Sequence, residues 1–292
     1  MHKQQTKTFW FTGKGGVGKS SIASYCAITL SKQGYKTLLI ESCDIPASDD
    51  FFNIKTEHKP KQALENLSVV NIDKYQTLFE AFGDALGSTK LANILLSNNA
   101  IKRFLRAAPG SGDMGLMYSL YSYANRSGYD YVIIDMPAFG HAYTLINIVG
   151  LGLKLFRAGP IHDLLSSISS WIKDPERSEM MLVSIPEELP CLETVDFFPK
   201  MKELELTIRS VILNQVVSGN DKQLPDSNIP DEIKRLIEIK EIREEGSRKW
   251  KSFLEEKLPL KVKNVSFISD NSFGNLMNGL ENTGVKIDDI LS

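Results

Sequence analysis

A glycine-rich segment near the start of the chain carries the residues best suited to chemistry. Residues 13–20 read Gly-Lys-Gly-Gly-Val-Gly-Lys-Ser and match G-x-x-x-x-G-K-[ST], the phosphate-binding loop pattern. Its glycines let backbone N–H groups converge on phosphate oxygens, Lys19 places a cation at the β- and γ-phosphates, and Ser20 offers a hydroxyl to Mg²⁺. We therefore expect ATP or ADP to bind here with Mg²⁺. The residues predicted to contact nucleotide in this segment are Gly13, Lys14, Gly15, Gly16, Val17, Gly18, Lys19, Ser20 and Ser21.

A second set of residues suited to nucleotide chemistry lies at the end of a later apolar run. Asp135 follows residues 131–134, which read Tyr-Val-Ile-Ile, and Pro137 and Gly140 come shortly after it. An acid at a strand end beside a phosphate loop holds Mg²⁺ through its waters. Gly140 would let the backbone approach the γ-phosphate and move on hydrolysis. We therefore predict that Asp135, Pro137 and Gly140 face the nucleotide, and that Asp135 and Ser20 serve the metal.

Apolar runs bounded by turn residues recur at the spacing of alternating strands and helices. They are apolar on both faces, which is typical of parallel strands covered by helices. The predicted strands are 8–12, 37–41, 69–72, 131–135, 181–185, 210–214 and 265–268. This alternation predicts an α/β fold with a doubly wound, mainly parallel sheet flanked by helices. Ligands then bind at the carboxyl ends of the strands.

Helical patterns lie between these runs. One covers residues 20–33 and ends at Gly34 as a C-terminal cap, and another covers 193–204. Residues 229–258 are highly charged and predict a long solvated helix, which Gly246 could break. One set of motifs in the whole chain predicts a single ATPase domain over residues 1–292, with helical insertions at about 75–127 and 142–178 that form a helical subdomain.

Composition excludes several classes of protein. The 292 residues include 34 Lys+Arg and 36 Asp+Glu, and this net charge of −2 argues against a nucleic-acid partner. Cys26, Cys43 and Cys191 form no CxxC pair, which excludes a self-contained thiolate zinc or iron–sulfur site and fits a reducing cytoplasm. We find neither a signal-peptide pattern nor an apolar window of ~20 residues. The expected location is cytoplasmic, without stable membrane insertion.

The early lysine of the loop points to a particular group of ATPases. The sequence K-G-G-x-G-K-[ST] resembles the deviant Walker A loop, and residues 135–141, Asp-Met-Pro-Ala-Phe-Gly-His, resemble the D-x-P-A-x-G-H segment of the ArsA-like family. That family contains arsenite-pump ATPases and targeting factors for tail-anchored proteins. The resemblance implies that Lys14 reaches across a dimer interface to the partner's nucleotide, in the manner of an arginine finger. The alternative is that Lys14 neutralises its own nucleotide or faces solvent.

Two later segments follow the family's order. Residues 184–194 resemble its P-E-E-x-P-x-x-E-T segment, which implies that Glu193 contacts the nucleoside. Residues 210–215 resemble a strand ending in V-x-N-Q, which implies that Asn214 reads adenine, since an amide both donates and accepts. Read without the resemblance, Glu193 is a helix-capping acid and Asn214 a turn residue.

The segment after the second strand departs from the family pattern. The family places an acid there, before a proline, to orient the attacking water. Counting from Ile40, Cys43 occupies that position, and Asp44 fits only with a shift of one residue. We expect Asp44 to orient the water and to assist the metal, together with Lys14 and Lys19 as catalytic residues. If Asp44 is misplaced, hydrolysis is slow or needs a partner.

The resemblance implies a dimeric, Mg²⁺-dependent ATPase that couples its nucleotide state to a protein partner or client. The dimer could be a homodimer or a heterodimer with a related ATPase. A catalytically weak nucleotide-binding subunit of a heterodimer is the alternative, and an arsenite-pump subunit is disfavoured because no metalloid-binding cysteine cluster is present. The apolar residues of 142–172 could form a groove for a hydrophobic client, although core or interface packing explains them as well.

Overall fold

A single sheet runs through the part of the chain that the computed structural model describes. That part comprises residues 5–42, 46–85, 110–126, 128–218, 230–268 and 287–291, with positions 97, 99, 103 and 107. The strands are β1 (Lys7–Gly13), β2 (Thr37–Glu41), β3 (Lys61–Leu64), β4 (Leu67–Asn71), β5 (Tyr131–Asp135), β6 (Ser178–Ser184), β7 (Ile208–Val216) and β8 (Lys261–Ser266).

The strand order places the glycine-rich loop at the centre of the sheet. The order is β3-β4-β2-β5-β1-β6-β7-β8, and every pair is parallel except β3 with β4. The chain runs from β1 to β2 on one side of β1 and later from β5 to β6 on its other side, so the winding reverses beside β1. Ligands of such sheets bind in the crevice beyond the strand ends at that point. Asp135 and Glu41 are register partners at the ends of β5 and β2, so their carboxyl groups belong to this same edge.

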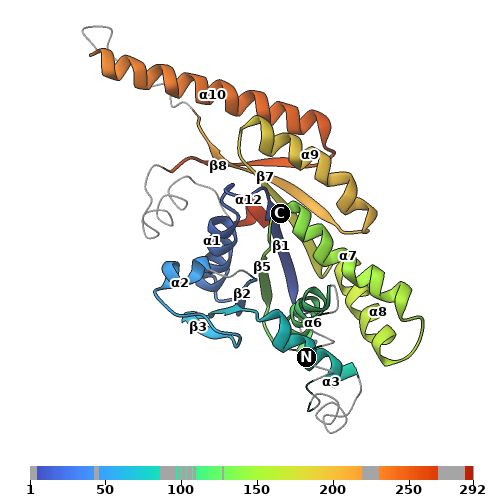
Figure 1. The fold of residues 1–292 in the computed structure, drawn as a ribbon. Helices are drawn as coiled ribbons and strands as arrows, with labels where there is room; N and C mark the ends of the chain where they lie inside the picture. Colours follow the sequence, from blue (N-terminus) through green and yellow to red (C-terminus); the bar gives the residue numbers. More distant parts are fainter. Residues whose placement is uncertain are drawn as a thin grey trace.

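Helices cover both faces of the sheet (Figure 1). One face carries α1 (Lys19–Lys32) and α12 (Ile287–Leu291), whose apolar residues pack with Phe9, Phe11 and Ile133. The other carries α6 (Ser111–Arg126), α7 (Phe139–Leu155), α8 (Pro160–Lys173) and α9 (Glu188–Glu203), around Trp10 and Trp171. The described elements also include α2 (Ala47–Phe52), α3 (Lys74–Ala85) and α10 (Asp231–Lys257). The predicted α/β fold with a mainly parallel sheet flanked by helices is confirmed.

The apolar helices α7 and α8 serve mainly as core. Leu145, Val149, Leu165 and Ile168 are buried, as are Trp171 and Ile172. Leu151 and Leu155, near the end of α7, are exposed. In the described ranges, no helix combines the length and the apolar character that crossing a membrane requires.

Several elements differ from the predictions. The helix predicted at 193–204 begins earlier, at Glu188. Pro190 is compatible with this start, because it lies in the first turn, where a missing N–H costs no hydrogen bond. The edge strand β3 was not predicted, since three of its four residues are exposed and it has no apolar run. The predicted break at Gly246 is wrong: α10 is continuous, because an isolated glycine costs a helix only ~1 kcal/mol.

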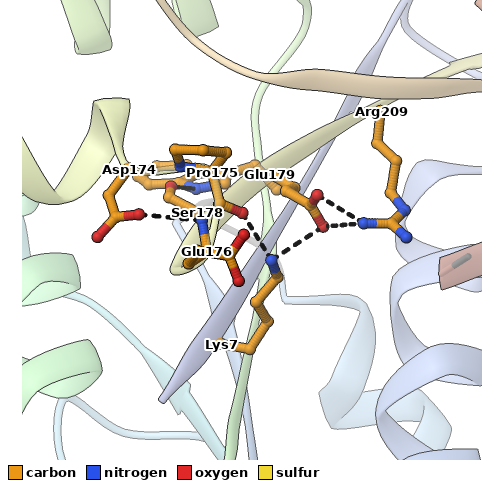
Figure 2. A network of polar contacts seen from close by, with 8 residues as sticks. Lys7, Asp174, Pro175, Glu176, Ser178, Glu179 and Arg209 are labelled. Atoms are coloured by element: carbon orange, nitrogen blue, oxygen red, sulfur yellow. Dashed lines mark hydrogen bonds and ion pairs between the residues drawn. The ribbon is translucent and has the colours of Figure 1, made fainter. Parts of the chain in front are cut away.

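An ion-pair network ties three strands together at the amino-terminal edge of the sheet (Figure 2). Glu179 of β6 is only 6% exposed, and both of its carboxylate oxygens lie 2.5 Å from the Arg209 Nη1 of β7. The Lys7 Nζ of β1 lies 3.2 Å from Glu179 Oε2 and donates to the Pro175 carbonyl at 2.7 Å. Because this network lies opposite the glycine-rich loop, it stabilises the sheet without approaching the candidate site.

Candidate nucleotide-binding site

The glycine-rich loop connects the end of β1 to the start of α1. Gly18 has φ +87°, a left-handed conformation that side chains with a Cβ rarely adopt, and a Cβ there would lie 2.4 Å from Asn214 Nδ2. A Cβ on Gly13 would lie 2.1 Å from the Val183 carbonyl oxygen of the neighbouring strand β6. Glycine is therefore required at both positions, and the loop leads its backbone N–H groups into the N-terminus of α1, where anions bind.

Lys19 folds back over this loop. Its Nζ donates to the Lys14 carbonyl at 2.9 Å, so the ammonium group spans the concave side of the loop. Burial lowers the pKa of Lys19 from its usual value, and the nearby Asp135 carboxylate opposes this shift. A half-buried lysine held in this way is placed to attract a polyphosphate.

Ser20 and Asp135, two of the residues predicted to serve the metal, contact each other. Ser20 Oγ donates to Asp135 Oδ2 at 2.6 Å. Burial raises the pKa of Asp135 to about 6, against the hydrogen bond from Ser20 and the charge of Lys19, which lower it. The other carboxylate oxygen, Oδ1, is buried and has no hydrogen-bond partner among the described residues. A buried oxygen of this kind fits a Mg²⁺-bound water, so the residues present suit the metal.

The segment after Asp135 is anchored to β1. The Met136 N–H donates to the Phe11 carbonyl at 2.9 Å, and Thr12 Oγ1 donates to the Pro137 carbonyl at 2.9 Å. Gly140 lies in the first turn of α7, and a Cβ there would meet no atom within 4 Å. The structure thus brings Pro137 to the edge of the loop and leaves open space at Gly140.

Lys14 is held within its own chain. Its Nζ forms an ion pair with Glu193 Oε1, which α9 supplies, and both side chains are partly exposed. The nucleoside contact expected of Glu193 and the cross-dimer role expected of Lys14 both stay predictions. What the structure adds is that the two residues pair with each other within one chain.

Asn214 lies behind the loop. It is 8% exposed, and its Nδ2 donates to the Val17 carbonyl at 3.0 Å. Together with the close approach to Gly18, this contact makes the end of β7 a support for the loop. Reading of adenine by Asn214 stays a prediction. The supporting contact was not foreseen, because the sequence gives no sign that residues 17 and 214 meet.

Asp44 and Cys43 lie outside the described residues, so the role of Asp44 in orienting water stays a prediction. The structure does reveal a carboxyl that the sequence reading missed, Glu41 at the end of β2. It is 1% exposed and accepts hydrogen bonds from the Ser48 N–H at 3.2 Å and from Ser48 Oγ. Burial raises its pKa to about 7, although these hydrogen bonds lower it. The sequence did contain a signal for Glu41: it is an acidic residue at the end of an apolar run that is predicted as a strand.

Comparison with known proteins agrees with this geometry. The sequence model of the ArsA ATPase family, described as anion-transporting ATPases, matches residues 6–159 and 161–266. These ranges contain the loop, Asp135, Glu193 and Asn214. The chain belongs to the ArsA family. The resemblance inferred from the motifs is thereby confirmed.

Relatives of this ArsA-family chain differ in length. A Halobacterium salinarum protein, provisionally named an arsenical pump-driving ATPase, is 28% identical over 65% of this chain, but that stretch covers only 32% of the relative. A similarly named Aquifex aeolicus protein is 27% identical over 73% of this chain and 81% of its own length. A Paramecium tetraurelia protein named ATPase ASNA1 homolog 1 is 24% identical over 76% of this chain and 78% of its own length.

Proposed function

We propose that the chain is an ATP-binding and ATP-hydrolysing switch that depends on Mg²⁺. The observation that carries the proposal is the Ser20–Asp135 hydrogen bond beside Lys19, at the N-terminus of α1. A cation, a hydroxyl and a carboxyl oxygen in need of a partner converge there on a loop that only glycines can form. This combination supports phosphoryl transfer better than simple anion binding.

Each residue has a part in this proposal. The loop's backbone N–H groups and Lys19 hold and neutralise the phosphates, while Ser20 and Asp135 hold the metal, Asp135 through water. Bound Mg²⁺ supplies charge neutralisation on the phosphate oxygens. Asp44 orients the attacking water, and the contacts of Met136 and Pro137 with β1 keep Asp135 in register with the loop.

We further propose that the switch works as a dimer in the cytoplasm. Nucleotide would draw Lys14 away from Glu193, and Lys14 would then stabilise phosphate charge in the partner. Nucleotide state would thereby be coupled to binding of a protein partner or client. The names of relatives include both arsenical pump-driving ATPases and an ASNA1 homologue. An anion or arsenite substrate is the weaker candidate, because the cysteines of this chain form no cluster in its sequence.

A second candidate is a catalytically weak subunit that pairs with an active paralogue. It is favoured by Cys43, which stands where the family has its water-orienting acid. Such a subunit would bind ATP tightly without turnover when it is alone, even at high concentration.

The two candidates are separated by measuring ATP turnover and ATP binding together. We expect Lys19→Ala to lower turnover about 100-fold or more, because it removes the cation that would stabilise the negative charge of the transferring phosphoryl group. Lys55→Ala, which removes an exposed lysine outside the glycine-rich loop, is the control and should leave turnover unchanged. Binding without turnover in the wild-type chain would favour the second candidate. Full turnover in Asp44→Asn would remove Asp44 from its proposed role.

A further inference from the structure

Glu41 is a buried carboxyl group to which the proposed function gives no part. It ends β2 and is 1% exposed. In the described part of the chain, no lysine, arginine or histidine forms an ion pair with it, and the charge that acts on it is that of another carboxyl group, Asp135. Buried charges in proteins are normally paired with an opposite charge or bound to a metal. The ionised form of Glu41 therefore lacks a counter-charge.

The strand register turns Glu41 toward the residues proposed to serve Mg²⁺. Successive side chains of a strand point to opposite faces, so register partners on parallel strands share a face. Leu39 and Ile133 are register partners, and both belong to the core cluster that α1 covers. Glu41 and Asp135 lie two residues further along the same strands and are register partners too. Both carboxyl groups therefore belong to the face on which α1 begins.

The first turn of α1 supplies Ser20 at this face. Its Oγ donates to Asp135 Oδ2 at 2.6 Å, and Asp135 Oδ1 is buried without a hydrogen-bond partner among the described residues. Neighbouring strands lie ~4.8 Å apart. A hydrated Mg²⁺ ion contacts acceptors through its waters at ~4–5 Å from the ion, so one ion can serve two carboxyl groups on neighbouring strands.

Ser48 fixes the Glu41 carboxyl group and leaves it room for a water. The Ser48 N–H donates to Glu41 Oε1 at 3.2 Å, and its hydroxyl donates to Oε2. A third hydrogen bond comes from the Ala47 N–H. An ionised carboxylate accepts about four hydrogen bonds, so Glu41 can accept one more. Its orientation is set by a serine that is itself fully buried.

We propose that Glu41 is a second carboxylate of the metal site, serving Mg²⁺ through a bound water beside Ser20 and Asp135. This inference rests on the proposed Mg²⁺-dependent function and deepens it. Lys19 already offsets the charge of Asp135. Glu41 has no such cation, so its counter-charge comes from the metal. Ser48 is the positioning residue that holds Glu41 in place.

The test is calorimetric titration of the full chain with ADP, once in excess Mg²⁺ and once in EDTA. ADP is chosen because binding is then measured without turnover. We call the ratio of the two affinities the Mg²⁺ gain. Glu41→Gln should lower the Mg²⁺ gain about tenfold or more, since losing a group that supports a metal ligand typically costs this much affinity. The ADP affinity in EDTA should stay the same or rise, because a negative charge near the phosphates is removed.

A purely structural role gives a different result. Pro46, at the start of α2, provides no side-chain hydrogen bond, so Glu41 could serve only to cap that helix. In that case Glu41→Gln, whose side chain still accepts from Ser48, would change the affinities in Mg²⁺ and in EDTA alike or change neither. Either outcome would overturn the proposal.

Two further variants complete the comparison. Glu65→Gln, which alters an exposed carboxyl group in the turn between β3 and β4, is the matched control and should keep the wild-type Mg²⁺ gain. Ser48→Ala keeps the Glu41 carboxylate but removes its hydroxyl partner, so it should lower the gain less than Glu41→Gln does. Urea unfolding in EDTA verifies that each variant is folded. If Glu41→Gln does not fold, an unchanged gain in Ser48→Ala overturns the proposal.

Asp135→Asn separates this inference from the proposed function. It should lower the Mg²⁺ gain as well, because Asp135 serves the metal in both. A wild-type chain without any Mg²⁺ gain, or an Asp135→Asn variant that keeps it, would overturn the proposed metal site and the role of Glu41 together. A loss in Asp135→Asn with none in Glu41→Gln would overturn the role of Glu41 alone.

Discussion

Two buried carboxyls lie on neighbouring strands at the edge where the nucleotide is proposed to bind. Glu41 and Asp135 are register partners on β2 and β5, and each has a raised pKa, about 7 and about 6. Burial is the main cause for both, and the negative charge of Asp135 further raises the pKa of Glu41. The fold tolerates these groups best when they are protonated, which links the stability of the protein without ligand to pH.

The sign of this linkage gives a prediction for Glu41→Gln. The pKa of Glu41 is higher in the folded chain than in the unfolded chain, where it is near 4.5. Its contribution to stability is therefore complete below about pH 4.5 and is lost as the pH rises through 7. The glutamine side chain is not ionisable but still accepts from Ser48, so the variant should lose less free energy of unfolding between pH 5 and 8, by about 2 kcal/mol. Urea unfolding at several pH values measures this.

The control for that measurement is Glu65→Gln, because Glu65 is exposed in the turn between β3 and β4. It should keep the slope of the wild-type chain. If Glu41→Gln also keeps that slope, then Glu41 is ionised in the folded protein and its burial has little cost.

At the scale of elements, buried strands were predictable from the sequence, and contacts between residues far apart in the chain were not. The runs at 37–41 and 131–135 match β2 and β5, because a strand covered on both faces must be apolar throughout. The edge strand β3 and the start of α9 depend on neighbours that the local sequence does not reveal. The same holds in the site: glycine spacing located the loop and the strand end located Asp135. The contacts of Asn214 with Val17 and of Glu193 with Lys14 depend on folding across almost 200 residues.

The support of the loop by β7 leads to a prediction for Asn214→Ala. The variant leaves the buried Val17 carbonyl without its partner and opens space beside Gly18. We expect a loss of about 1–3 kcal/mol in the free energy of unfolding without nucleotide, since a buried acceptor without a partner costs this much. Ser218→Ala, at an exposed position just beyond β7, is the control. If Asn214→Ala lowers only ATP affinity and leaves stability unchanged, its role is confined to the nucleotide.

Over the whole molecule, the two edges of the sheet have different tasks. The carboxyl edge holds the loop, Asp135 and Glu41, where burial raises the pKa of both carboxyl groups. The amino edge holds Glu179 between Lys7 and Arg209, where the charges already satisfy one another (Figure 2). Stability at one edge should therefore be separable from binding at the other.

Glu179→Gln tests this separation. It removes the buried negative charge and leaves two cations of β1 and β7 side by side, so we expect the free energy of unfolding to fall by about 1–3 kcal/mol. That range lies below the usual cost of breaking a buried pair, because Lys7 and Arg209 are partly exposed and solvent screens them. Thermal and urea unfolding measure the loss, and titration calorimetry well below the unfolding temperature measures ATP binding. ATP affinity within about twofold of the wild-type value would fit separate edges, because the network lies a full strand length from the loop. A marked loss of affinity in a chain of unchanged stability would mean that strain at the amino edge is transmitted along β1 and β6 to the loop.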